Sequence, residues 1–305
     1  MRYAIALDVG GTTIKAGVVG TDGAVWQPGQ YPTPASPDAL ITRSARIISD
    51  YGRMILEGEV AGADGPIQPS QVIDTVGFDV PGIVDESLGM AVFSANLGWR
   101  DFPAREALSD ASGRPVAFGH DVRTGALAEA HWGVGLENFF YVAIGTGIAS
   151  VLILNGMPVA VSGWAGELGQ ITVPDWDGNP VSLERVASAS AICRRGASLG
   201  LIEECDGAAG LYQLVDSGSP EATQIVDYSM KQLAEALAPI VSAVGKVPIV
   251  IGGGLANRGQ KLFDELSTKL DEALGIVPTP EVIGAKLGSQ SQLKGAGLRA
   301  FRAER

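Results

Sequence analysis

Residues 5–19, IALDVGGTTIKAGVV, combine an apolar run, a glycine-rich turn and a second apolar run. The first run is Tyr3 to Leu7, the second is Ile14 to Val19, and the turn between them is Asp8–Thr12. Two β-rich runs separated by a glycine turn predict paired strands, and Asp22-Gly23 then turns the chain again. The stretch therefore predicts a sheet that opens as a hairpin meander.

The same plan occurs twice along the chain, with strands first and helices after. A helix is expected at 37–61 in the first half and helices near 184–200 and 220–244 in the second. This order indicates an α/β protein of two domains with similar plans. We expect a smaller N-terminal domain, 1–121 plus about 289–305, and a larger C-terminal domain, 122–288.

Composition and charge exclude several classes of protein. The chain has 305 residues, of which 46% are hydrophobic, and this apolar content excludes a disordered chain. Its net charge of −12, without a Lys/Arg block, argues against binding to nucleic acid. The 2 Cys residues fit a reducing cytosol. Asp8 interrupts the first apolar run before a secretory signal forms, so we expect a cytoplasmic protein.

One uncharged segment, 138–166, imitates a membrane span. Gly-Thr-Gly at 145–147 and Asn-Gly at 155–156 divide it into pieces of strand length. Asn-Gly is also a strong signal for a two-residue hairpin. We therefore expect two buried strands and a hairpin here, and no association with a membrane.

Glycine-rich turns follow three of the expected strands. Glycine lets backbone N–H groups approach a ligand, and consecutive amides form concavities that bind anions. None of the turns matches the P-loop or the dinucleotide fingerprint, and each alone is also explained as a tight turn. Together they favour a nucleotide site, with Asp8 near a metal ion. The candidate residues are Asp8, Gly10, Gly11, Thr12, Thr13, Gly145, Thr146, Gly147, Gly252, Gly253 and Gly254.

Six segments together resemble one known family. IALDVGGTTIKAGVV is similar to the first phosphate motif of actin-fold sugar kinases, AIGTGIASVLILNG to the second and VIGGGLA to the adenosine motif. NLGWRDFP, GHDVRTGALAE and AGELGQ resemble segments of the ROK family of bacterial sugar kinases and sugar-responsive repressors. The resemblance spans residues 4 to about 300. It implies two ribonuclease-H-like domains of the actin and hexokinase type around a central cleft.

The resemblance also implies an ATP- and Mg²⁺-dependent kinase that phosphorylates a hexose, with glucose the default substrate. Asp121 matches the family's catalytic carboxylate. A hydroxyl that attacks a phosphoryl group needs an acceptor for its proton, and a carboxylate at a helix start supplies one. Taken alone, Asp121 is also explained as the cap of a helix that runs to about Trp132. Asp8 would stand near Mg²⁺ through water.

Other positions match sugar contacts of the family. Asn96, Glu167 and Glu184 match residues that hold sugar hydroxyls, although each Glu is also explained as a solvated charge at a helix end. His120 stands where the family usually has Asn; it would contact sugar, tune the base, or serve only as a hydrogen-bonded structural histidine. Gln170 replaces the family's usual His, and it retains the ability to donate and accept a hydrogen bond.

The segment after Gln170 departs from the family pattern. Most members have a cysteine cluster there that holds zinc, whereas residues 171–183 contain no Cys. Cys193 and Cys205 lie too far downstream to replace it, so no zinc site is expected. This departure leaves open a second reading, a sugar-binding sensor with little kinase activity. Because the chain begins directly with the first strand, we do not expect a DNA-binding domain; the family implies a homodimer or higher homo-oligomer.

Overall fold

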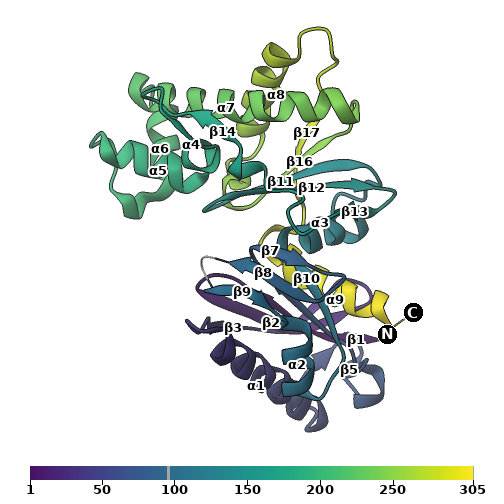
Figure 1. The fold of residues 1–305 in the computed structure, drawn as a ribbon. Helices are drawn as coiled ribbons and strands as arrows, with labels where there is room; N and C mark the ends of the chain where they lie inside the picture. Colours follow the sequence, from purple (N-terminus) through teal and green to yellow (C-terminus); the bar gives the residue numbers. More distant parts are fainter. Residues whose placement is uncertain (95–96, 305) are drawn as a thin grey trace. The chain divides into compact units, whose positions relative to one another are not determined.

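A computed structural model describes residues 1–94 and 97–304 of the chain. The described chain forms two compact units (Figure 1). Each unit has its own cluster of buried hydrophobic residues. The first unit comprises 1–135, 160–165 and the segment from 289 onwards, and the second comprises 136–159 and 166–288. This division differs from the expected boundary at residue 121, because the helix after His120 packs within the first unit. The two units are consequently similar in length.

The first unit is built on a five-stranded sheet with the order β10-β6-β1-β2-β3. Strands β1, β2 and β3 are antiparallel, which confirms the expected meander, whereas β6 and β10 extend the sheet in parallel with β1. The strands are β1 (Tyr3–Val9), β2 (Thr13–Gly20), β3 (Val25–Pro32), β6 (Val76–Val80) and β10 (Val116–His120).

Helices cover both faces of this sheet. Side chains alternate between the faces of a strand, so neighbouring residues of β6 contact different helices. Phe78 belongs to the core that α1 and α2 share, whereas Gly77 lies against Ala296 on the other face. Helix α9 covers that second face and also packs on α3. The helices are α1 (Pro37–Leu56), α2 (Ala104–Ser112), α3 (Asp121–Trp132) and α9 (Ser291–Ala303).

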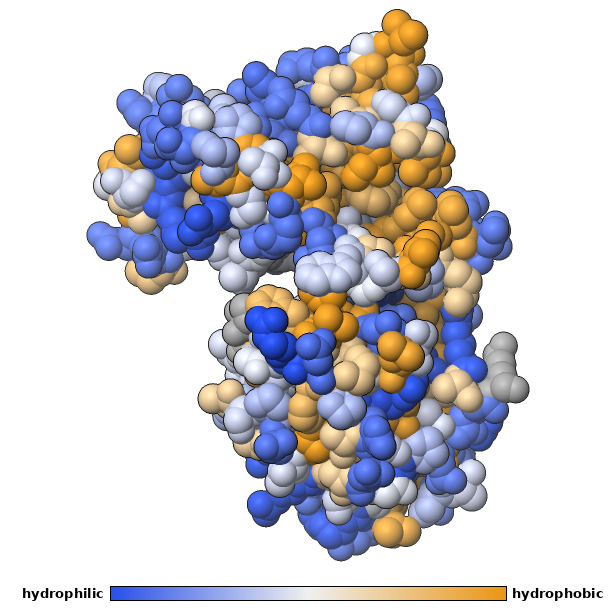
Figure 2. All heavy atoms as spheres, viewed as in Figure 1, coloured by the Kyte–Doolittle hydropathy of each residue, from blue (hydrophilic) through white to orange (hydrophobic). Residues whose placement is uncertain are grey.

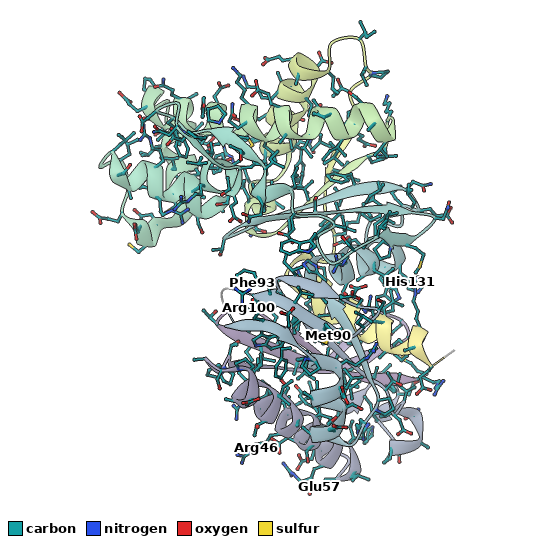
Figure 3. All side chains as sticks on the ribbon, in the orientation of Figure 1. Arg46, Glu57, Met90, Phe93, Arg100 and His131 are labelled. Atoms are coloured by element: carbon teal, nitrogen blue, oxygen red, sulfur yellow. The ribbon has the colours of Figure 1, made fainter. Side chains whose placement is uncertain are left out.

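A second, smaller sheet of the first unit has the order β7-β8-β9. Arg100 of β9 lies over the ring of Phe93 of β8, 5.4 Å from its centroid, and both side chains are labelled in Figure 3. Trp99, the first residue of β9, is buried. The short strands are β7 (Ile83–Asp85), β8 (Met90–Ser94), β9 (Trp99–Phe102), β4 (Ala61–Gly62) and β5 (Gly65–Pro66).

The second unit repeats the sheet order of the first. Its order is β13-β12-β11-β16-β17, again with an antiparallel meander of the first strands and two parallel additions. The expected fold class, two ribonuclease-H-like domains, is thereby confirmed. The strands are β11 (Phe139–Ile144), β12 (Ile148–Leu154), β13 (Met157–Val159), β16 (Ile249–Gly252) and β17 (Val282–Gly284).

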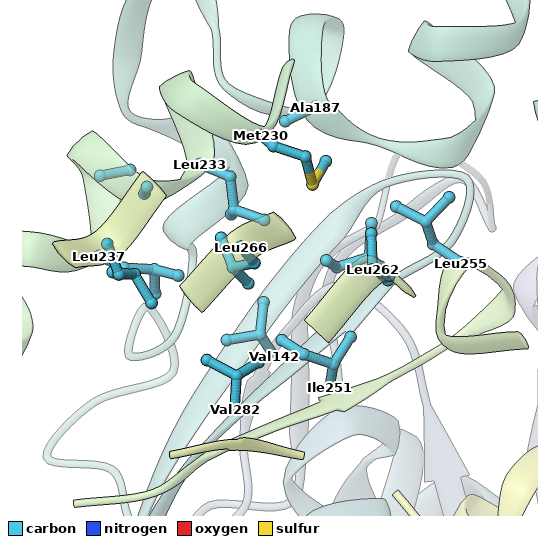
Figure 4. Close-up of a cluster of buried hydrophobic side chains, with 14 of the residues drawn as sticks. Val142, Ala187, Met230, Leu233, Leu237, Ile251, Leu255, Leu262, Leu266 and Val282 are labelled. Carbon is cyan, nitrogen blue, oxygen red and sulfur yellow. The ribbon is translucent and has the colours of Figure 1, made fainter. Parts of the chain in front are cut away.

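Helices α7 and α8 pack their apolar sides on the second sheet. Figure 4 shows Leu233 and Leu266 from these helices beside Val142 and Ile251 from the strands. A hairpin, β14 (Thr172–Pro174) and β15 (Pro180–Ser182), precedes the helices. The helices are α4 (Glu184–Ala187), α5 (Ala189–Ser198), α6 (Gly207–Asp216), α7 (Pro220–Val244) and α8 (Gln260–Leu274).

The surface of each unit carries many hydrophilic residues on the face that Figure 2 displays, with apolar residues among them. Within residues 1–94 and 97–304, every helix is too short or too polar to cross a membrane. The uncharged segment 138–166 forms β11, β12 and β13 with their turns, as expected.

Candidate functional site

A row of four residues crosses the first sheet at one level, near the carboxyl ends of β1, β6 and β10. Strand register pairs Lys15 with Asp8, Asp8 with Asp79, and Asp79 with Gly119. Lys15 Nζ lies 3.6 Å from Asp8 Oδ2 and donates a hydrogen bond of 2.9 Å to the Ser289 carbonyl. Burial raises the pKa of Asp8, and Lys15 opposes the shift. Polar groups are therefore concentrated where the parallel strands end.

The first glycine-rich turn joins β1 to β2 at this edge of the sheet. The Gly10 N–H donates to the Thr13 carbonyl over 2.8 Å, and Thr33 Oγ1 donates to the Gly10 carbonyl over 2.8 Å. Gly11 and Thr12 are exposed at the tip of the turn. An exposed Gly-Thr tip on an anchored hairpin presents backbone amides and a hydroxyl to an incoming anion.

Asp121 is the first residue of α3, and His120 caps this helix. His120 Nδ1 accepts the Arg123 N–H over 3.3 Å, so the cap is the histidine and not the aspartate. Asp121 Oδ1 accepts the Val122 N–H over 2.7 Å, and the Asp121 side chain is 23% exposed. A helix start stabilises negative charge, and the partial exposure leaves Asp121 accessible to a ligand.

His120 belongs to the interior of the first unit. The residue is 5% exposed, its ring forms a hydrogen bond with the Gly82 backbone, and Nδ1 lies 3.4 Å from Asp121 Oδ1. Burial, followed by the guanidinium groups of Arg123 and Arg299, lowers the pKa of His120 to about 3. These contacts favour the structural alternative for His120 over a sugar contact.

Gln170, Glu184 and Gly147 meet in the second unit. Gln170 Nε2 donates to Glu184 Oε1 over 2.9 Å, and a Cβ added to Gly147 would lie 2.7 Å from Glu184 Oε2. The β14–β15 hairpin brings Gln170 and Glu184 together. Thr172 pairs with Ser182 in this hairpin, and Gln170 precedes Thr172 by two residues while Glu184 follows Ser182 by two. Glu167 occupies the N-cap position of the short helix Leu168–Gln170, and its side chain makes no capping hydrogen bond. Three residues predicted from the sequence, Gln170, Glu184 and Gly147, therefore form one cluster.

Two of the three glycine-rich turns line one pocket of the second unit. This pocket has a volume of about 600 Å³, and its lining includes Gly145, Thr146 and Gly254. Helix α5 contributes Ser190, near its start, and Arg194, further along the helix. Backbone amides at a helix N-terminus, together with a cation, suit a phosphate group. The second phosphate motif and the adenosine motif thus converge in the structure.

The Gly252–Gly254 turn needs glycine for physical reasons. Gly253 has a φ of +79°, and a Cβ there would lie 2.7 Å from the Ile144 carbonyl carbon and backbone nitrogen. The ring of Tyr141 fills the space beside Gly252. Gly254 has no atom within 4 Å of an added Cβ and faces the pocket. The first two glycines therefore shape the turn, and the third borders the pocket.

A second pocket of about 490 Å³ shares Ala189, Gly207, Ala208 and Gly254 with the first. Arg258 and Tyr212 line it, and the guanidinium carbon of Arg258 lies 4.7 Å from the Tyr212 ring centroid. Asp216 holds Arg258 through two contacts of 2.6 Å, and these hold the pKa of Asp216 well below its usual range. Together the pockets offer polar and apolar space of the kind a nucleotide needs.

Asp8 is chemically suited to a hydrated Mg²⁺. That ion takes oxygen ligands and retains several waters, so one protein carboxylate is a sufficient anchor. The neighbouring Asp79 is fully buried, and burial raises the pKa of its carboxyl group well above the usual range, so Asp8 is the candidate anchor. No cluster of three or more His, Cys, Asp or Glu residues suited to a metal occurs within 1–94 and 97–304. Cys193 is buried and Cys205 exposed, and both are free thiols.

One predicted site residue, Asn96, lies outside the described residues. The sequence also failed to predict several residues around these sites. Arg194, which lines the first pocket, belongs to no motif that the sequence displays. Glu86, Arg123 and Arg299 surround the start of α3, and no local pattern links residues so distant in sequence.

The repeated sheet order and the strand-end glycine turns define a two-domain protein of the actin and hexokinase type. The chain belongs to the ROK family, whose sequence model matches residues 4–301. A glucokinase from Halalkalibacterium halodurans is 31% identical over 86% of this chain and 83% of its own length. The expected enzyme class, a sugar kinase, is confirmed by such relatives.

Solved structures agree with the fold. A ROK hexokinase from Thermus thermophilus superposes with a TM-score of 0.79 at 27% identity, covering 99% of both chains. A ROK family glucokinase from Streptomyces griseus, solved in complex with glucose and AMPPNP, gives a TM-score of 0.77 over 98% of this chain and 99% of its own. At 23% identity, this second likeness shows the fold alone.

Proposed function

We propose that the protein transfers the γ-phosphoryl group of ATP to a hydroxyl of a hexose, with glucose as the default substrate and Asp121 as the general base. The observation that carries this proposal is the pocket of the second unit, where residues of two glycine-rich turns converge beside Arg194. The glucokinase relative supports glucose, and the AMPPNP in a solved relative supports ATP as the phosphoryl donor.

The chemistry assigned to Asp121 is proton removal. The sugar oxygen forms a bond to the γ-phosphorus while the bond from that phosphorus to the bridging oxygen of ADP breaks. The hydroxyl proton passes to a carboxylate oxygen of Asp121, and ADP leaves with the bridging oxygen. The Val122 N–H, 2.7 Å from Oδ1, helps to fix the direction of the carboxylate.

The remaining predicted residues bind and orient. Backbone amides of Gly11, Gly145 and Gly254 contact phosphate or adenosine, and Thr12, Thr13 and Thr146 add hydroxyl donors. When bound through water near Asp8, Mg²⁺ neutralises charge on the phosphates.

Sugar hydroxyls are assigned to Asn96, Glu167, Gln170 and Glu184. The Gln170–Glu184 hydrogen bond supports this assignment, because it fixes the orientation of both side chains beside Gly147. A hydroxyl can donate to the carboxylate and accept from the amide.

Replacement of Asp121 by Asn tests the assignment of the base. The variant keeps the size of the side chain and loses the proton acceptor, so kcat should fall about 10²–10⁴-fold. ADP release, coupled to a dehydrogenase assay, is measured with glucose, mannose, fructose, allose and the N-acetylhexosamines. Asp110→Asn, on an exposed position of α2, is the matched control and should retain the wild-type kcat. An Asp121→Asn enzyme with wild-type turnover would refute the role of the aspartate.

The alternative function is a sugar-binding sensor, and the presence of Gln170 in place of a titratable histidine motivates it. Calorimetry separates the two functions. A kinase binds both sugar and a non-hydrolysable ATP analogue, whereas sugar binding without nucleotide binding would favour the sensor.

A cytoplasmic location and self-association into dimers or larger oligomers remain part of the proposal. Analytical ultracentrifugation tests the self-association.

A further inference from the structure

We propose that Glu86 is a positioning residue, which fixes the proposed base Asp121 by holding the chain on both sides of it. This inference rests on the proposed function. Glu86 lies in the turn between β7 and β8, distant in sequence from everything it binds. Its carboxylate is the shared acceptor of three donors from different elements.

The two oxygens of Glu86 have different partners. Oε1 accepts the His120 N–H over 3.0 Å and Arg123 Nε over 3.2 Å. Oε2 accepts Arg299 Nη1 over 3.2 Å. One carboxylate thereby joins the end of β10, the first turn of α3 and helix α9.

The two arginines extend this hold to the surrounding backbone. Arg123 is 1% exposed, and its Nη2 donates to the Val84 carbonyl over 2.8 Å. Arg299 Nη2 donates to the Phe118 carbonyl over 2.6 Å. Contacts therefore fix residues 118, 120 and 123, and Asp121 lies between them.

Stability alone is a weak explanation for the cluster of Glu86, Arg123 and Arg299. Charged groups lose hydration on burial, and apolar side chains of similar volume often stabilise a protein equally well. Arg123 and Arg299 together carry two positive charges, whereas Glu86 supplies one negative charge. The partly exposed Asp121 lies next to this cluster, and His120 Nδ1 lies 3.4 Å from Asp121 Oδ1.

Precise placement of a reacting group is a large part of catalysis. A shift of about 1 Å in a catalytic group can cost 10²-fold in rate. Loss of Glu86 removes the acceptor of the His120 N–H and of one N–H from each of Arg123 and Arg299, so the end of β10, the first turn of α3 and α9 are no longer joined. We therefore expect Glu86→Ala to lower kcat about 10–100-fold and to leave the KM for ATP within about twofold of wild type.

Glu86→Gln is the conservative variant. Its amide oxygen can still accept from His120 and Arg123, but its NH₂ group faces the donor of Arg299. We expect it to recover part of the kcat that Glu86→Ala loses. Glu106→Gln, on an exposed position of α2, is the control for removal of a carboxylate and should behave as wild type.

Combination with Asp121→Asn tests whether Glu86 acts through the base. If it does, Glu86→Ala lowers kcat in the wild-type background but produces little further loss in the Asp121→Asn background. An equal fold loss in both backgrounds would overturn the proposal, as would an unchanged kcat for Glu86→Ala. If Glu86→Ala fails to fold, the same cycle is run with Glu86→Gln.

Hydrogen exchange separates this inference from the proposed function. Mass spectrometry of peptides covering 116–125 reports the start of α3 without any substrate. We expect faster exchange there in Glu86→Gln and an unchanged rate in Glu106→Gln. Unchanged exchange in Glu86→Gln would overturn the positioning role even in an active kinase. Faster exchange in a protein that phosphorylates no sugar would retain the structural link and refute the kinase.

Discussion

Replacement of Gly295 by Ala should destabilise the first unit, although it introduces a better helix former. Gly295 lies inside α9, where this helix crosses α3. A Cβ added there would lie 2.6 Å from the Thr124 carbonyl carbon and closer still to the carbonyl oxygen. Carbon atoms in ordinary contact are about 3.5–4.0 Å apart, so the two backbones must separate by about 1 Å.

The expected magnitude combines two opposing effects. Overpacking of a tight interior costs about 1–3 kcal/mol, and contact with backbone atoms places this site at the upper end. Ala is about 1 kcal/mol more favourable than Gly inside a helix. The net change in the free energy of unfolding is therefore a loss of about 2 kcal/mol, or roughly 4–8 °C in Tm for a unit of this size.

Gly52→Ala is the matched control. Gly52 also lies inside a helix, α1, but the nearest atom to its added Cβ is Arg114 Nη2 at 3.8 Å. Here only the gain in helix propensity remains, about 0.5–1 kcal/mol. Urea unfolding followed by far-ultraviolet circular dichroism compares the two variants. If Gly295→Ala is as stable as Gly52→Ala, the inferred close contact between α9 and α3 is incorrect.

Two further predictions concern the second unit. Gly147→Ala places a methyl group 2.7 Å from Glu184 Oε2, so the carboxylate must move and the KM for sugar should rise roughly 10-fold. Gly145→Ala meets no atom within 4 Å and should raise this KM less; equal effects in steady-state assays would count against Glu184. Burial, and then Asp227, raise the pKa of Glu265 from 4.5 to about 7, so the folded state binds this proton more tightly and loses stability as the pH rises through that window. Glu265→Gln should therefore be more stable relative to wild type at pH 8 than at pH 4, and equal differences in thermal melts at both pH values would contradict the shift.

Local sequence signals predicted the strands and their turns well, because those signals act over a few residues. Two helices end at residues other than those expected. The helix expected at 37–61 ends at Leu56, since Gly58 adopts a φ of +73°. The helix expected near 184–200 is two helices, because Ser188 is extended and its Oγ caps α5 by accepting the Ala191 N–H.

The elements that the sequence did not predict depend on tertiary contacts. Helix α6 begins with Gly207 and two alanines, a start without a clear apolar period, and Leu211 and Tyr212 then bury it in the core. The β14–β15 hairpin has only three residues in each strand, and Asp175 and Asn179 close the turn between them by hydrogen bonds to each other.

Some residues of the candidate site could likewise be predicted from local sequence, whereas others depend on tertiary contacts. Motif residues at strand ends were predictable because a turn needs glycine locally, and Gly145 and Gly254 do border one pocket. For His120 the sequence left three alternatives open, and the burial of its ring favours the hydrogen-bonded structural histidine. The cluster of Glu86, Arg123 and Arg299 joins residues 37 and 213 positions apart, and no pattern within a single element encodes such distances.

The return of α9 to the first unit has a consequence for biosynthesis. The second unit interrupts the first, so a ribosome makes all residues of the second unit before it reaches Ser291. Until α9 emerges, the apolar residues on one face of the first sheet, including Ala4, Ala6 and Val19, lack the α9 side chains that bury them. The first unit to be synthesised is therefore the last to be completed, and a nascent chain that stalls before α9 exposes an apolar sheet face of the kind that chaperones bind.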